Sequence, residues 1–186
     1  MKNGDENGDR PYFSHLQLRK IGSVPIFVLL LLAAAGPAAA EERALELPNG
    51  ETLRYELMTA EAQSARHTAA RILGHLAAGD IEEAALLSNA PRRRFEVLRT
   101  YRESVGDDEF KRVFTQYLSA QNRLIAEIGI GPRRLLIWDL EDAADPLAGQ
   151  YYVEVDGKFL MDDVPSEERF KLRRVLQAYR SGRLSP

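Results

Sequence analysis

The chain contains no cysteine among its 186 residues. This absence excludes disulfides, thiol chemistry and the lipid anchor that exported lipoproteins carry on a cysteine. An excess of charge of one sign is also lacking, because 25 basic residues stand against 28 acidic ones. Such a balanced chain has no extended positive field to hold a polyanion, so we expect no nucleic-acid partner.

Sequence patterns for catalysis and cofactor binding are absent as well. The chain has no Gly-x-Ser-x-Gly elbow, and no Gly-rich phosphate loop follows a predicted strand. His67 and His75 fall on one predicted helix at positions about 12 Å apart along its axis, too far to share a metal ion. We therefore predict two surface histidines, no metal, no cofactor and no enzyme activity.

The N-terminus has the composition of a secretory signal peptide. Arg19 and Lys20 precede an apolar run over residues 24–35, and small residues follow up to Ala40. The run is shorter than the roughly 20 residues that a membrane-spanning helix needs. We therefore predict cleavage after Ala40, a mature protein that begins at Glu41, no remaining membrane anchor and a periplasmic location.

Residues 44–57 predict a β-hairpin around Pro48-Asn49-Gly50. A three-residue loop closed by Gly50 places Leu45 opposite Leu53, whereas a two-residue Asn-Gly turn would split the apolar side chains between faces. With the longer loop, one face collects all of the apolar residues, which are Leu45, Leu47, Leu53, Tyr55 and Leu57. The pattern therefore selects the longer loop.

Four helices are predicted next from the helical spacing of apolar side chains. They cover residues 60–78, residues 80–87, a segment that begins near Pro91, and a segment that begins at Asp107 or Asp108. Asp80 followed by Glu83 predicts a capping box, and Asp107 or Asp108 is the expected cap of the fourth helix.

Four further strands are predicted after the helices, at residues 123–130, 133–141, 150–154 and 158–161. Residues 166–180 predict a final helix. A three-residue loop at 155–157 pairs Glu154 with Lys158. This register places four large side chains on one face, namely Tyr151, Val153, Phe159 and Met161.

Helices followed by an antiparallel meander predict an α+β fold. Its consecutive N-terminal helices pack on a curved sheet, with an extra N-terminal hairpin and a C-terminal helix. Residues 76–85 and 151–159 resemble the helix break and the closing hairpin of the nuclear-transport-factor-2-like (SnoaL-like, cone-shaped) superfamily. A cystatin-like sheet wrapped on a helix is the alternative. The predicted parts are a signal peptide (1–40), a hairpin (41–58), the α+β domain (59–163) and a C-terminal helix with its tail (164–186).

The resemblance implies a conical cavity, and arginines are its candidate ligand-binding residues. Arg92, Arg93 and Arg94 gather in the first turn of a predicted helix, where the helix dipole disfavours cations and a compensating anion is expected. Arg94 and Arg102 either hold an anionic ligand or lie at the rim of the cavity. The aromatic candidates, which either line the cavity or fill the core, are Tyr101, Tyr117 and Trp138.

The predicted strand 133–141 is apolar on both faces, with Leu135 and Ile137 on one and Leu136 and Trp138 on the other. The outer face therefore needs a cover. A second copy of the chain, giving a homodimer, is the preferred cover, and the extra terminal elements of the same chain are the alternative. Asp139 and Glu141, at the end of this strand, are expected in solvent.

Taken together, the sequence predicts an exported, non-catalytic binding or assembly module of the bacterial envelope. Its partner is expected to be a small anionic or amphipathic ligand or another envelope protein. The alternative is a small isomerase- or hydrolase-like enzyme with a carboxylate base, which the resemblance implies through the ketosteroid isomerase branch of the superfamily.

The predicted export signal has a measurable consequence. Expression of the full chain in a Gram-negative host should yield an envelope protein whose intact mass corresponds to a start at Glu41, because Ala40 closes the run of small residues. A recovered mass that still includes residues 24–35 would contradict cleavage and leave an anchored protein.

Overall fold

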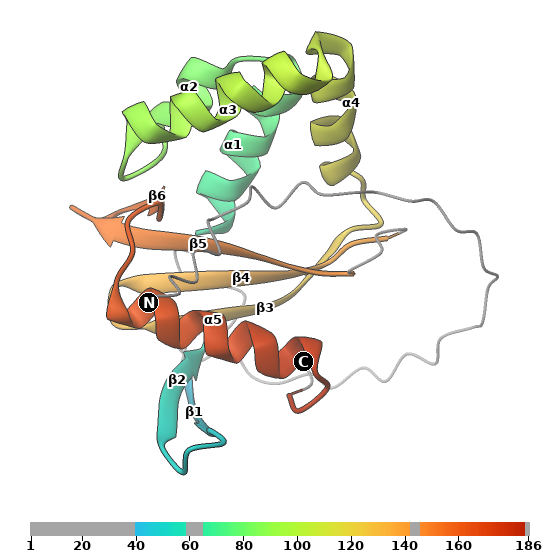
Figure 1. Cartoon of the computed structure of the whole chain (residues 1–186). Coiled ribbons are helices and arrows are strands. Elements are labelled where there is room, and N and C mark those ends of the chain that lie inside the picture. The colour runs from blue at the N-terminus through green and yellow to red at the C-terminus, as the bar shows by residue number, and fades with distance from the viewer. Residues whose placement is uncertain (1–39, 59–64, 142–145, 185–186) are drawn as a thin grey trace, which may run out of the picture.

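The structure is a computed structural model that describes residues 40–58, 65–141 and 146–184. Within these ranges the chain has the predicted α+β fold (Figure 1). The helices are α1 (Arg66–Ala78), α2 (Ile81–Leu86), α3 (Pro91–Val105), α4 (Asp107–Tyr117) and α5 (Glu167–Arg180). The strands are β1 (Glu41–Glu46), β2 (Thr52–Leu57), β3 (Arg123–Ile130), β4 (Arg133–Asp139), β5 (Leu147–Val155) and β6 (Lys158–Met161). The predicted signal peptide before residue 40 and the first residues of the predicted helix 60–78 lie outside the described residues.

The six strands form one antiparallel sheet in chain order. The register of the β1–β2 hairpin is confirmed, since Leu45 pairs with Leu53 and Gly50 has a φ of +81°. Only Glu56 and Leu57 of β2 pair with β3, so the hairpin projects beyond the sheet (Figure 1). Its apolar face turns toward α5 and joins the core there.

The predicted register of the β5–β6 hairpin is wrong by one residue. Val155 pairs with Lys158, and Glu154 pairs with Phe159. The turn therefore has two residues, Asp156 and Gly157, both with positive φ. Aspartate tolerates this conformation, and a turn of this kind follows the twist of the strands. As a result, Phe159 and Met161 pack on the helices α1–α4 instead of sharing a face with Tyr151.

Helices cover both faces of the sheet (Figure 1). On one side α1–α4 pack against Leu136 and Tyr152. On the other side α5 packs against Leu135 and Ile137, which are fully buried. The terminal elements of the same chain, which were the alternative cover, thus fill the face at which a homodimer was preferred. A second copy would meet α5 there, and dimerisation itself stays a prediction.

Two of the predicted helix caps are wrong. The side chain of Asp80 makes no capping hydrogen bond, because α1 ends at Gly79 in the left-handed conformation and the chain enters α2 with Asp80 outside the extended region. The residue before α4 is Gly106, so Asp107 and Asp108 lie in the first turn of that helix. No helix in the described ranges is both long and apolar enough to cross a membrane.

The start of α1 is tied to the sheet by a buried carboxylate that the sequence did not reveal. Glu127 on β3 is 1% exposed, and its Oε1 accepts a hydrogen bond from the backbone N–H of Ala65 at 3.2 Å. The Nε of Arg66 lies 3.4 Å from the other carboxylate oxygen. Glu127 therefore serves as a long-range cap for α1.

We expect Glu127→Ala to lower the free energy of unfolding by about 1–3 kcal/mol, because the Ala65 N–H would stay buried without an acceptor. Glu127→Gln keeps an oxygen acceptor and should lose clearly less. Urea denaturation of the two variants measures the difference. Equal losses would show that the hydrogen bond to Ala65 contributes nothing.

Candidate functional site

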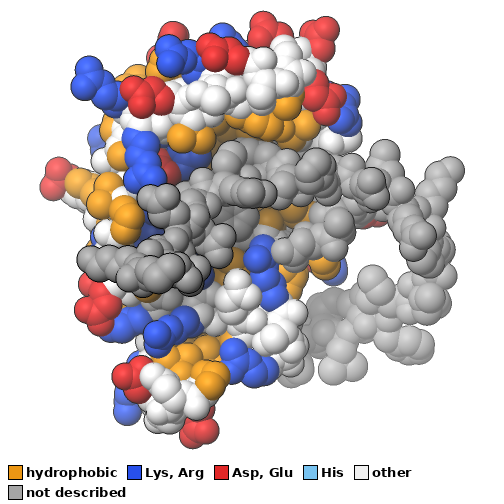
Figure 2. Space-filling view, in the orientation of Figure 1, with side chains coloured by type: hydrophobic (Ala, Val, Ile, Leu, Met, Phe, Trp, Pro, Cys, Tyr) orange, Lys and Arg blue, Asp and Glu red, His pale blue; other side chains and the backbone are white. Residues whose placement is uncertain are grey.

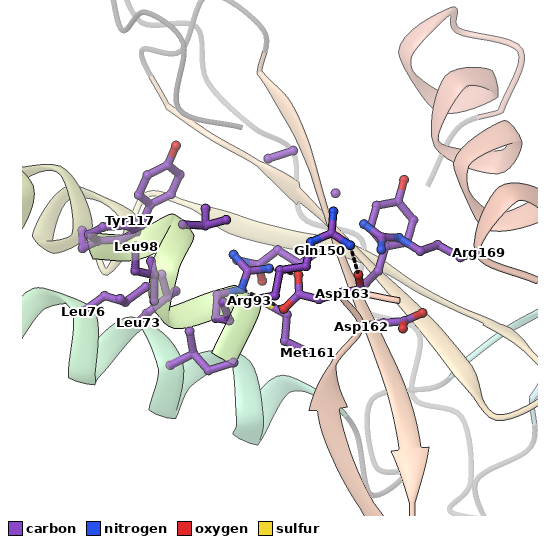
Figure 3. Close-up of a pocket in the computed structure, with 17 residues that line it drawn as sticks. Leu73, Leu76, Arg93, Leu98, Tyr117, Gln150, Met161, Asp162, Asp163 and Arg169 are labelled. Carbon is purple, nitrogen blue, oxygen red and sulfur yellow. Dashed lines mark hydrogen bonds and ion pairs between the residues drawn. The ribbon is translucent and has the colours of Figure 1, made fainter. Parts of the chain in front are cut away.

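The first half of β5 has no neighbouring strand on the side where β6 pairs with the second half. Strand β5 has nine residues, but the four residues of β6 pair only with Tyr152–Val155. Met161, the last residue of β6, is also held to the α2–α3 connection, because its N–H donates to the Leu87 carbonyl at 2.8 Å and its carbonyl accepts from the Asn89 N–H at 2.9 Å. A cleft of about 230 Å³ lies between the helical layer and the first half of β5 (Figure 3).

One wall of the cleft is apolar. It is built mainly by α1, α3 and α4 and consists of Ile72, Leu73, Leu76, Val97, Leu98, Phe114, Tyr117 and Met161. Hydrophobic side chains gather beneath the charged outer surface of this helical layer (Figure 2). Burial raises the pKa of Tyr117, which therefore lines the cleft as a neutral phenol.

The opposite end of the cleft is polar and belongs to the start of α3, the loop after β6 and α5 (Figure 3). Asp163 accepts two hydrogen bonds from the Arg94 guanidinium, one of them from Nε at 2.8 Å, and a third from the Ser88 hydroxyl at 2.6 Å. Asp162, 2% exposed, accepts from Arg133 Nε at 3.0 Å and from Asn89 at 2.7 Å. Both carboxylates are thus matched by an arginine of the chain.

Arg169 also lines the cleft, and no described carboxylate forms an ion pair with its guanidinium. It lies in the first turn of α5, and its guanidinium stacks over the Tyr151 ring at 5.2 Å. Its Nε is buried and has no hydrogen-bond partner. A buried donor of a cation without an acceptor is costly, so this position favours an anion from outside the described structure.

Gln150 presents a second unused donor. Its Oε1 accepts from Trp138 Nε1 at 3.0 Å and from the Tyr152 hydroxyl at 3.3 Å. Burial raises the pKa of Tyr152, which keeps this hydroxyl protonated and able to donate. The two bonds fix the amide with its oxygen turned to the core, and no other described residue accepts from its nitrogen.

The structure brings only part of the predicted ligand-binding set together. Arg94 and Tyr117 line the cleft. Arg102 lies elsewhere, 3.5 Å from Asp107, because it follows Arg94 by about two helical turns. Tyr101 packs on Phe110 in the core with ring centres 5.7 Å apart, and Trp138 acts on the cleft only through Gln150.

Arg169 was missed, although the sequence held a signal for it. Like Arg94, it is a cation in the first turn of a helix, against the dipole. Of the two carboxylates expected in solvent near the end of β4, Glu141 is exposed, whereas Asp139 is partly buried and pairs with exposed Arg123. Among the described residues, no group of three His, Cys, Asp or Glu side chains is placed to hold a metal ion.

Comparison of the chain with protein-family models, with curated proteins and with solved structures finds no match in any of the three. The likeness to the nuclear-transport-factor-2-like superfamily therefore stays a prediction.

Arg94 and Arg102 have the same predicted role, but their ion pairs should stabilise the fold to different extents. A double-mutant cycle of Arg94→Ala and Asp163→Ala should give a coupling of about 1–3 kcal/mol, because this pair is hydrogen-bonded and largely buried. The matched cycle of Arg102→Ala and Asp107→Ala should give less than about 1 kcal/mol, because Asp107 is exposed. Urea unfolding measures both, and equal couplings would contradict the assignment of Arg94 to a structural pair.

Proposed function

We propose that this protein is an exported, non-catalytic binding module of the bacterial envelope, and that its ligand is amphipathic and anionic. The observation that carries the proposal is the buried Nε of Arg169, which has no hydrogen-bond partner, at the polar end of a cleft whose other wall is apolar. Apolar pockets with a few convergent polar groups are the usual form of small-ligand sites. The ligand places its apolar part against α1, α3 and α4 and its anionic group against Arg169.

The state of the carboxylates supports binding over catalysis. A general base needs a free acceptor within reach of the substrate proton. Asp162 and Asp163 each accept hydrogen bonds from an arginine and from a neutral side chain. Ser88 is not among the residues that line the cleft, and its hydroxyl donates to a carboxylate that Arg94 already neutralises.

The export part of the proposal fits the arrangement of the elements. Strand β1 begins at Glu41, directly after the predicted cleavage position, so removal of residues 1–40 leaves every described helix and strand in place. The fold has the cleft between its helices and sheet that the resemblance to the cone-shaped superfamily implies, and we propose membership on that basis.

The test uses octanoate as the probe and octanamide as its uncharged analogue. Octanoate should bind the mature protein, and Arg169→Gln should weaken it about ten- to a hundredfold, because the variant loses a charge-assisted contact. Octanamide should be insensitive to the substitution. Isothermal titration calorimetry measures all four affinities.

Arg173→Ala is the matched control, because this arginine lies on the exposed side of the same helix and does not line the cleft. It should leave the octanoate affinity unchanged. Equal octanoate affinity in the wild type and in Arg169→Gln would sink the proposed site, and turnover of a screened compound would sink the non-catalytic assignment.

A further inference from the structure

The open half of β5 presents backbone groups to the cleft. Odd-numbered residues of this strand point their N–H and C=O groups away from β4, since the Tyr151 carbonyl accepts from the Asp162 N–H at 2.8 Å and the Leu147 carbonyl accepts from Arg180 at 2.7 and 3.0 Å. Glu154, an even-numbered residue, donates in the opposite direction, to Pro132. Alternation along the strand therefore directs the N–H and C=O of Gly149 outward as well.

Gly149 is the position at which this edge has no partner. It lies between two residues whose carbonyls are already bonded, it is itself buried, and it lines the cleft. No described residue forms a hydrogen bond to its outward N–H or C=O. A buried amide and carbonyl without partners are unfavourable, and an unpaired strand edge is a template for a further strand.

We propose that the ligand of this cleft is an extended peptide that carries a carboxylate. One peptide residue exchanges two hydrogen bonds with Gly149, and the carboxylate contacts Arg169. This inference rests on the proposed function and names the chemical class of its ligand. It uses a recognised mode of binding, in which backbone hydrogen bonds to a sheet edge supply affinity and side-chain pockets supply specificity.

The unused groups favour a peptide over an acyl chain. Gly149 offers a donor and an acceptor on one side of the strand, and Gln150 adds an amide nitrogen nearby. A hydrocarbon chain satisfies none of the three, whereas a peptide backbone provides both an N–H and a C=O for Gly149. Side chains of an extended peptide alternate in direction, so one set faces the apolar wall and the other faces Tyr151 and Arg169.

The carbonyls of Leu147 and Tyr151, which flank Gly149, are bonded to Arg180 and to Asp162. The free edge is therefore short, and a single donor amide of the peptide is critical. This restriction distinguishes edge pairing from nonspecific hydrophobic binding, in which no single amide matters.

The experiment measures fluorescence anisotropy with labelled hexapeptides that begin Gly-Ser-Gly and end in three residues drawn from Ala, Val, Leu and Phe. The best peptide is then compared with its C-terminal amide, with an amide that carries one Glu side chain, and with a series N-methylated at each amide in turn. We expect one N-methyl position to weaken binding more than about tenfold and its two neighbours to be tolerated. Binding of the amide that carries a Glu side chain shows whether the carboxylate comes from a side chain or from the C-terminus.

Arg169→Gln should weaken the carboxylate peptide about ten- to a hundredfold and leave the uncharged amide unaffected, while Arg173→Ala should change neither. Uniform tolerance of N-methylation, or binding of octanoate but of no peptide, would overturn the peptide inference and leave the proposed function standing. Failure of both octanoate and the peptides to bind would overturn the two together.

Discussion

The sheet has two apolar faces, and the rest of the structure depends on this constraint. Three successive residues of β4, Leu135, Leu136 and Ile137, are fully buried although they alternate in direction. Each face therefore needs its own helical layer, and α1–α4 and α5 supply the two. Two such layers approach each other only around an edge of the sheet. They do so where β6 ends, which explains why the cleft collects residues from both layers.

Buried charge sets the chemistry of that edge. The loop after β6 largely buries the side chains of Asp162 and Asp163, and a buried carboxylate without a partner is unfavourable. Arg133 and Arg94 neutralise them, so Asp163 supplies the anion that Arg94 needs. The same reasoning that predicted an anion for Arg94 was sound, but the anion belongs to the chain itself. Arg169 also lies in the first turn of a helix, next to Glu167 and Glu168, but its buried Nε has no hydrogen-bond partner.

Local patterns in the sequence predicted most of the fold, and contacts between distant residues account for the misses. The one-sided hairpin at residues 44–57 and the two-faced strand β4 follow from side-chain alternation alone. The β5–β6 register depended on whether Asp156 adopts a positive φ, which sequence leaves open. Glu127 as a cap of α1, and Arg94 rather than Arg102 at the cleft, depend on residues more than sixty positions away, which no local pattern contains.

Gly149 connects the two polar features of the cleft. A Cβ added at this residue would lie 2.5 Å from a methyl group of Leu176, so the Leu176 side chain packs directly on the backbone of Gly149. Leu176 and Arg169 are about two turns apart on α5 and therefore lie on the same side of that helix. A larger residue at 149 would displace the Leu176 side chain from this contact. The backbone groups of the open edge and the Arg169 guanidinium therefore belong to two elements, β5 and α5, that pack directly against each other at Gly149 and Leu176.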